Sequence, residues 1–184
     1  MADYILGLDL GLSTGFAVLD MNGKVVMHGS WKNNAPLEGK KGEDKPRRQQ
    51  IRFHNFQASL IDLLRTFPEI KYVGYEYVWK HTSTAQTQLY GGWRGVLMAT
   101  CQARNLPVTD VVWSKLKSES CGGKTPPTVR QAKGLKARRV AWKAYVIEAA
   151  KDKWGITPKN DDEADALWAA EVVRQQVALK RKPK

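Results

Sequence analysis

The chain lacks any long apolar run, and only two of its 184 residues are cysteines. No stretch approaches the roughly 18 consecutive apolar residues of a membrane span. No basic segment followed by an apolar core precedes the first expected strand, so we expect neither a secretion signal nor a membrane partner. Cys101 and Cys121 have the spacing of neither a zinc site nor a disulfide framework, which favours a reducing cytoplasm.

Acidic residues and histidines are also few. The three histidines show no metal-ligand spacing, and 18 acidic residues stand against 30 lysines and arginines, for a formal net charge of +12. The excess is concentrated in residues 113–143, where only Glu119 is acidic. Such a block can be a solvated face, but it is also the usual footprint of a protein that follows a phosphate backbone.

The length and the hydrophobic fraction of 42% are those of one ordinary globular domain. We expect this domain to span residues 1–177, followed by a basic C-terminal tail at residues 178–184. The dipeptide Asn22-Gly23 is a strong hairpin signal between apolar runs. It predicts an antiparallel meander of three strands at the start of the chain.

Two further strands then alternate with helices, which predicts an α/β fold with a mixed sheet of three antiparallel and two parallel strands, flanked by helices. The expected strands cover residues 4–10, 16–19, 24–27, 72–78 and 108–112. The expected helices cover residues 51–67, 84–104, 135–154 and 161–177. Residues 32–46 and 113–134 carry loop composition and are expected to be irregular.

Four carboxylates occupy positions where an unpaired charge is costly. Asp9 and Glu76 each lie near the end of an apolar strand pattern, and Asp162 and Asp165 share one face of a helix. Capping of a turn or of a helix N-terminus is the structural alternative, but it does not explain Asp165, which lies a full turn into the helix. Hard divalent cations prefer oxygen ligands, so the pattern predicts a site for two metal ions that hydrolyse a phosphodiester. Asp161 also shares a face with Asp165, so either Asp161 or Asp162 can be the ligand.

The segments around these acids resemble the RuvC family of Holliday junction resolvases, within the RNase H-like superfamily. The matching segments are residues 5–11 with Gly15, residues 75–79 and residues 162–167. The resemblance implies an RNase H-like fold and a homodimer that cuts branched DNA, a four-way junction, in the cytoplasm of a bacterium or of a phage-infected cell. It implies two Mg²⁺ ions per active site, with Mn²⁺ as an alternative. The implied metal ligands and catalytic acids are Asp9, Glu76, Asp162 and Asp165.

The resemblance also assigns residues to the DNA. Trp79, three positions after Glu76, corresponds to an aromatic residue that stacks on a base at the crossover. Lys117 and Lys136 are the best counterparts of the family's catalytic lysines, with Lys124 and Lys133 as alternatives. The other expected contacts to nucleic acid are Lys80, Arg47, Arg48, Lys115, Lys124, Arg130, Lys133, Arg138 and Arg139. Residues 91–95 resemble the start of the family's dimer-forming helix, whereas the inserted residues 124–134 depart from its pattern and leave the cleavage sequence open.

Three other functions remain open from the sequence. A related RNase H-like nuclease would cut flaps, other branched DNA or RNA–DNA hybrids, because a fold does not fix a substrate. An actin-like or sugar-kinase-like ATPase begins with a similar strand and Asp-x-Gly loop, but requires a second related domain. A non-catalytic nucleic-acid-binding protein would use the basic stretch alone.

Overall fold

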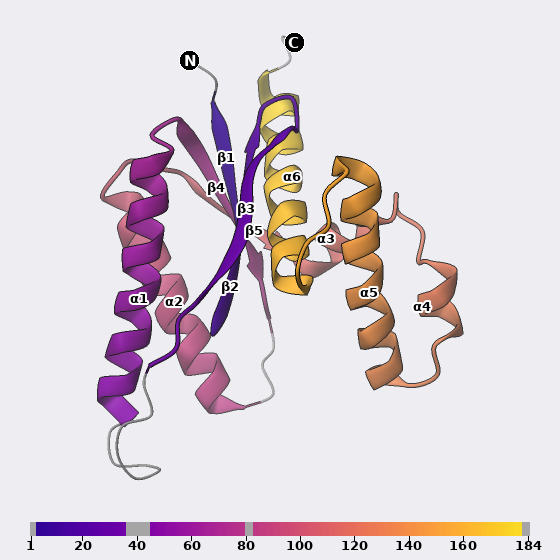
Figure 1. Cartoon of the computed structure of the whole chain (residues 1–184), viewed down its shortest axis with the longest axis horizontal. Coiled ribbons are helices and arrows are strands. Elements are labelled where there is room, and N and C mark those ends of the chain that lie inside the picture. Colours follow the sequence, from indigo (N-terminus) through magenta and orange to yellow (C-terminus); the bar gives the residue numbers. More distant parts are fainter. Residues whose placement is uncertain (1–2, 36–44, 80–82, 182–184) are drawn as a thin grey trace.

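The computed structural model describes residues 3–35, 45–79 and 83–181, which form one five-stranded sheet covered by helices on both faces (Figure 1). The strands are β1 (Tyr4–Asp9), β2 (Ser13–Asp20), β3 (Val25–Lys32), β4 (Ile70–Tyr77) and β5 (Val108–Val112). Their order is β3-β2-β1-β4-β5, with β1, β2 and β3 antiparallel and β4 and β5 parallel to β1. The predicted mixed sheet is therefore confirmed.

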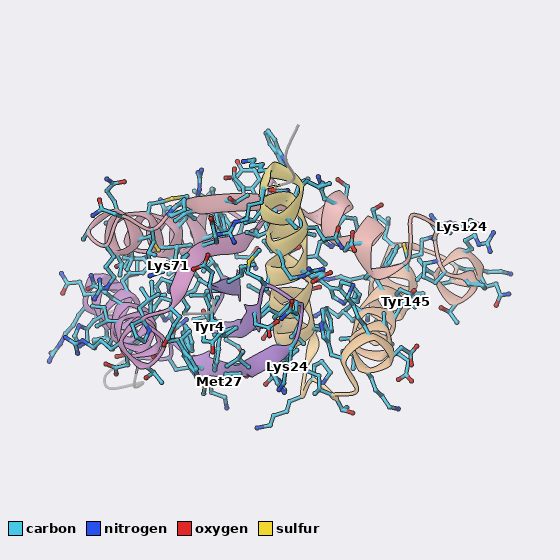
Figure 2. All side chains as sticks on the ribbon, turned by 90° about the horizontal axis from the view of Figure 1, so that it is seen from above. Tyr4, Lys24, Met27, Lys71, Lys124 and Tyr145 are labelled. Carbon is cyan, nitrogen blue, oxygen red and sulfur yellow. The ribbon has the colours of Figure 1, made fainter. Side chains whose placement is uncertain are left out.

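The helices form two layers that enclose the sheet, as the view from above shows (Figure 2). They are α1 (Lys45–Thr66), α2 (Thr84–Gln102), α3 (Trp113–Ser120), α4 (Pro127–Gln131), α5 (Leu135–Trp154) and α6 (Asp161–Arg181). Alternation along β1 feeds two separate cores, because successive side chains of a strand point to opposite faces. Leu6 and Leu8 pack with α1 and α2, whereas Ile5 packs with α6 and its neighbours α3 and α5.

Helix α6 lies directly against the backbone of the three central strands. The helix is faced by Gly15 in β2, Gly7 in β1 and Gly74 in β4. At each of these positions a side chain would collide with α6. A Cβ atom at Gly7 would collide with the backbone of Ala166, and one at Gly15 with the backbone of Asp162. These glycines therefore set how deeply α6 sits and where its first two turns meet the end of β1.

Several element boundaries differ from the sequence expectations, and strands β2 and β3 are longer than expected. Residues 113–134, expected to be irregular, contain α3 and α4, because Leu116 and Val129 each anchor a short helix to the core and a proline begins α4. Helix α6 continues to Arg181, which forms an ion pair of 2.6 Å with Asp3, so residues 178–181 are helical and not part of a tail. Helix α1 begins at Lys45 inside the expected loop, whose residues 36–44 lie outside the described ranges, as do residues 182–184.

Cys101 and Cys121 are both free thiols, the first buried and the second half-buried. Burial raises the pKa of the Cys101 thiol to about 11, so this residue acts as a small apolar core residue. Among the helices of the described ranges, none combines the length and the apolarity needed to cross a lipid bilayer.

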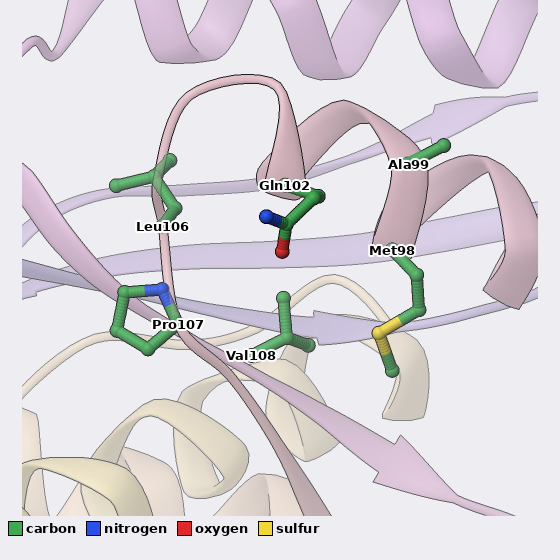
Figure 3. A pocket seen from close by; sticks show the side chains of 6 residues that line it. All are labelled: Met98, Ala99, Gln102, Leu106, Pro107 and Val108. Atoms are coloured by element: carbon green, nitrogen blue, oxygen red, sulfur yellow. The ribbon is translucent and has the colours of Figure 1, made fainter.

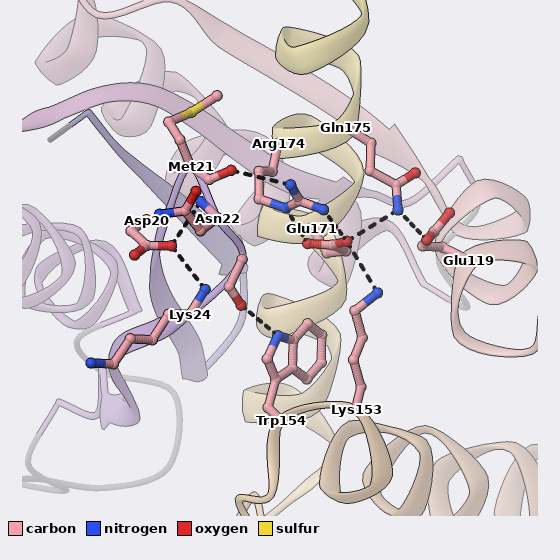
Figure 4. Close-up of polar contacts among 11 residues, drawn as sticks. Asp20, Met21, Asn22, Lys24, Glu119, Lys153, Trp154, Glu171, Arg174 and Gln175 are labelled. Atoms are coloured by element: carbon pink, nitrogen blue, oxygen red, sulfur yellow. Dashed lines mark hydrogen bonds and ion pairs between the residues drawn. The ribbon is translucent and has the colours of Figure 1, made fainter.

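A buried glutamate ties the outer helices to α6 and to the β2–β3 hairpin (Figure 4). Glu171 is 1% exposed and accepts two hydrogen bonds of 2.7 Å from Arg174, and Lys153 of α5 lies 3.1 Å away. Arg174 also donates to the carbonyl of Met21, and the indole of Trp154 donates to a second hairpin carbonyl. Burial alone would raise the pKa of Glu171, but the hydrogen bonds from its partners lower it below the ordinary value of 4.5.

Replacing this glutamate should make stability less sensitive to acid. A carboxyl whose pKa is depressed in the folded state contributes stability above its unfolded pKa and loses it as the pH falls through the folded one. We expect Glu171→Gln to lower the free energy of unfolding at pH 7 by about 2–3 kcal/mol, and the difference from wild type to shrink below pH 4.5. Thermal melts from pH 3 to 8 measure it. Glu148→Gln, which removes an exposed pair with Lys151, should cost under about 0.5 kcal/mol.

Two glycine-to-alanine changes, one at the contact between α6 and the sheet and one on α2, should have opposite effects on the free energy of unfolding. Gly7→Ala forces α6 away from β1, and overpacking of this kind costs about 1–3 kcal/mol or more. Gly91→Ala adds a methyl group to a helix position with no atom within 4 Å, so it should stabilise the chain by about 0.5–1 kcal/mol. Chemical denaturation of both variants tests this, and equal effects would contradict the proposed role of Gly7.

Candidate metal centre

Two neighbouring parallel strands deliver the first two carboxylates. Leu8 of β1 pairs with Tyr75 of β4, so the next residues, Asp9 and Glu76, lie side by side at the same edge of the sheet. Both strands alternate so that these two side chains face α6, where Asp165 occupies the second turn. Ligand oxygens of Asp9, Glu76 and Asp165 all lie within 4.8 Å of one another. The structure thus brings together three of the four predicted acids.

Burial and mutual repulsion make these carboxylates hard to ionise. Burial holds the pKa of Asp9 and of Asp165 well above the ordinary value of 3.8. The charge of Glu76 and the charges of the other acids on α6 add to this shift. Burial also raises the pKa of Glu76, and the charge of Lys117 opposes that shift. Three converging carboxylates that repel one another are the donor set that a hard divalent cation prefers, so the residues fit the predicted metal.

The neighbouring acids at the start of α6 have different partners. Asp161 forms an ion pair with Lys143 of α5. Asp162 is half-buried, and burial raises its pKa while a hydrogen bond with Ser13 lowers it. It is not one of the three residues grouped within 4.8 Å, although its charge acts on both Asp9 and Asp165.

A second buried glutamate fixes the first turn of α6. Glu163 is 1% exposed, and its carboxylate contacts His28 at 3.2 Å and Ser30 at 3.3 Å, both on β3. The side chain of Asn160 accepts a hydrogen bond from the Glu163 amide and so caps the helix. Sequence reasoning missed this contact, because His28 lies 135 residues away in the chain and carries no local signal.

The turn between β1 and β2 is also held by a residue that is distant in the sequence. Asn33 is fully buried, and its amide group donates to the carbonyl of Gly11 at 2.7 Å and to the hydroxyl of Thr14 at 2.8 Å. On the other side of the centre, the hydroxyl of Tyr90 in α2 donates to the carbonyl of Glu76 at 2.8 Å. These residues hold the two strand ends that carry Asp9 and Glu76, and the sequence alone singled out none of them.

Lys117 lies beside the carboxylates in an aromatic enclosure. Its side chain is 7% exposed, and its Nζ atom lies 2.7 Å from the centre of the Trp113 ring and 4.0 Å from that of Trp142. Burial lowers its pKa to about 8, against the opposing charges of Asp165 and Glu76. Within the described part of the chain, Nζ has no hydrogen-bond acceptor.

The other expected DNA contacts lie on the surface. Trp79 is 80% exposed just past the end of β4, with its ring edge-on to Tyr77 at 5.3 Å. Arg47 and Arg48 lie in the first turns of α1, and Lys80 lies outside the described residues. Seven of the basic residues expected from the sequence are exposed on α3, α4, α5 and the loops between them: Lys115, Lys124, Arg130, Lys133, Lys136, Arg138 and Arg139.

Arg94 is an additional basic residue that sequence reasoning did not select. Its guanidinium donates to the hydroxyl of Tyr75 at 2.7 Å and lies over the ring of Tyr77.

A hollow lined by Met98, Ala99, Gln102, Leu106, Pro107 and Val108 lies where α2 ends and β5 begins (Figure 3). Because β5 runs parallel to β4, this hollow is at the opposite end of the sheet from Glu76.

Comparison with known proteins identifies the fold. No family model and no curated protein sequence matches the chain. Among solved structures, RuvC of Thermus thermophilus in complex with a Holliday junction substrate superposes with a TM-score of 0.72, at 15% identity over 97% of this chain and 96% of the other. A second structure of that RuvC gives a TM-score of 0.67, at 15% identity over 96% of both chains. The yeast mitochondrial Holliday junction resolvase gives 0.56, at 14% identity over 97% of this chain and 82% of the other.

The chain therefore has the RNase H-like fold of RuvC, with the strands and flanking helices in the expected places. The resemblance that three short segments indicated in the sequence is confirmed across nearly the whole length at the level of the fold.

The repulsion among the carboxylates predicts that removing one stabilises the metal-free protein. An acid whose pKa is raised by folding binds its proton more tightly in the folded state, so stability falls as the pH rises above the ordinary value of 3.8. We expect Asp165→Asn, in the presence of a metal chelator at pH 7, to raise the free energy of unfolding by about 1 kcal/mol, or roughly 2–4 °C in Tm.

Thermal melts at pH 4 and pH 7 test this expectation, since the gain should shrink at the lower pH. The matched change Asp152→Asn removes an exposed carboxylate outside the centre and should have little effect. A destabilised Asp165→Asn protein at pH 7 would show that the carboxylate has a stabilising partner.

Proposed function

We propose that this chain is a metal-dependent DNA endonuclease that resolves Holliday junctions. The observation that carries the proposal is the convergence of Asp9, Glu76 and Asp165 at one edge of a sheet whose fold is that of RuvC. One of the matching structures is a complex with a Holliday junction substrate, which supports branched DNA as the partner. The net charge of +12 supports a polyanionic substrate in general.

The three grouped carboxylates would hold the metal, which we propose to be two Mg²⁺ ions, or Mn²⁺ in their place. Bound divalent ions supply an activated water and stabilise the leaving oxygen in phosphodiester hydrolysis. Asp162 is our fourth ligand, because Asp161 is already engaged by Lys143, whereas the charge of Asp162 acts on all three grouped carboxylates. The charge of Lys117 in α3 acts on Glu76 and Asp165, and Lys117 would neutralise charge on the scissile phosphate.

Several residues would position the junction without contacting the metal. The exposed basic residues from Lys115 to Arg139, with Arg47, Arg48 and Lys80, would bind phosphates and make affinity fall with salt. The exposed ring of Trp79 would stack on a base at the branch point. Lys136 lies in the first turn of α5 and is exposed, so we propose it for phosphate binding and Lys117 for the catalytic role.

We further propose that the active form is a homodimer, because a two-fold dimer presents one site to each of two opposed strands of a four-way junction. Gly91 and Gly95 of α2 have open space around them, which would let a second copy approach closely, whereas Gly92 packs on the Phe53 ring of α1. The free thiols of Cys101 and Cys121 fit action in the cytoplasm of a bacterium or of a phage-infected cell.

A cleavage assay with Mg²⁺ tests the function. It compares a mobile and an immobile four-way junction with a flap, a plain duplex and an RNA–DNA hybrid. We expect paired, symmetric nicks in the junction, and we expect Asp165→Asn to slow them by at least about a hundredfold while junction binding persists. Asp152→Asn, with the same change of charge, should cut as wild type does.

The same proteins give a readout of the metal that does not depend on cutting. Wild type should bind about two Mn²⁺ per chain at neutral pH, measured by electron paramagnetic resonance, and Asp165→Asn should bind them at least about tenfold more weakly. Preferential cutting of flaps or hybrids would assign the same centre to a related nuclease. If the metal bound but no nucleic acid were cut, the nuclease proposal would be wrong.

A further inference from the structure

A cleft of about 520 Å³ opens between α3, α4 and α5, next to the carboxylate centre. Its volume lies within the range of about 300–1,000 Å³ that is typical of small-molecule sites. The polar and aromatic side chains that line it are Trp113, Ser114, Thr125, Arg130, Arg138 and Trp142, with Lys117 among them. Helix α4, which belongs to the inserted residues 124–134, supplies one wall.

The chemistry of this cleft calls for an anion. The ammonium of Lys117 is buried against two tryptophan rings without a hydrogen-bond acceptor among the described residues, and burial of a donor without an acceptor is costly. Arg130 and Arg138 add two more cations, and none of the described residues that line the cleft is acidic. Arg138 donates to the carbonyl of Ala132 at 3.3 Å, which fixes it at the entrance to α5.

The cleft also offers an aromatic surface. The side chain of Trp113 is 52% exposed although it belongs to a helix that is otherwise anchored in the core. Trp142 is half-buried, with its ring centre 6.4 Å from that of Trp113. Stacking of a base on an aromatic side chain is favourable and accepts any base. Aromatic rings beside three cations are therefore complementary to both parts of a nucleotide.

Lys117 connects the cleft to the centre. Lys117 lines the cleft with its Nζ atom enclosed by the Trp113 and Trp142 rings, and its charge also acts on Asp165 and Glu76. A phosphate bound by Lys117 would consequently lie between the cleft and the carboxylates, so the group entering the cleft would be attached to that phosphate.

We propose that this cleft binds one unpaired nucleotide next to the scissile phosphate, with its base on Trp113 and its phosphate oxygens on Lys117 and Arg130. The proposal rests on the proposed nuclease function and adds a specificity site to it. A base in an intact duplex is stacked and paired, so only a strand that is open at the branch point supplies the occupant at low cost. The inserted helix α4 then selects branched over continuous DNA.

The test uses a single-stranded thymidine tetranucleotide and the uncleaving Asp165→Asn protein. The indole N–H signals of the tryptophans are followed by nuclear magnetic resonance during the titration. We expect the signals of Trp113 and Trp142 to shift, and those of Trp154 and Trp168, which pack against each other at the other end of α5, to stay in place. Arg130→Gln should weaken binding about tenfold, as loss of a charged hydrogen bond does.

Arg65→Gln is the matched control, because Arg65 is exposed in the last turn of α1, carries the same charge and does not line the cleft. It should weaken binding less than about threefold. Equal losses from the two arginine changes, or shifts that leave Trp113 unaffected, would overturn the proposal. These outcomes concern binding alone, so they separate it from the nuclease function, which fails only if the wild-type protein cuts no DNA.

Discussion

The close seat of α6 on three neighbouring strands is the constraint on which the other features depend. Gly7, Gly15 and Gly74 leave no side chain between the helix and the sheet, so α6 approaches as closely as two backbones allow. That depth places Asp165 within reach of Asp9 and Glu76. A helix held one side chain farther away would keep the same sequence of acids without bringing their oxygens together. The candidate metal centre therefore depends on the absence of side chains at these three glycines as much as on the acidic residues.

Helix α6 shows two ways of burying a negative charge. Glu163 and Glu171 are as buried as core residues, yet each has partners on another element: His28 and Ser30 on β3, and Lys153 on α5. These pairs fasten α6 to the edge strand β3 at its first turn and to α5 near its middle. Among the described residues, Asp165 has no comparable partner and instead converges with other carboxylates. Two acids of this helix therefore stabilise the fold, whereas Asp165 belongs to the candidate metal centre.

Local patterns in the sequence predicted the mixed sheet, the long helices and the three acids that the structure groups together, because each depends on periodicity or on a turn signal within a few residues. They did not predict α3 and α4, which are short and are stabilised by single anchors, Leu116 and Val129, whose burial depends on distant helices. Nor did they predict the pairing of His28 with Glu163 or the enclosure of Lys117 by two tryptophans. These contacts join residues far apart in the chain, where a single sequence carries no signal for proximity.

The positions of the three grouped carboxylates along the chain have a consequence for the folding of the protein during its synthesis. Its carboxylates come from residues near the start, the middle and the end of the described chain, and β1 at the centre of the sheet is covered by α6. Contacts of such large sequence separation form slowly, and they cannot form on a growing chain until its last helix has been synthesised. The basic residues of 113–143 are therefore synthesised before Asp165 can join Asp9 and Glu76 at the centre.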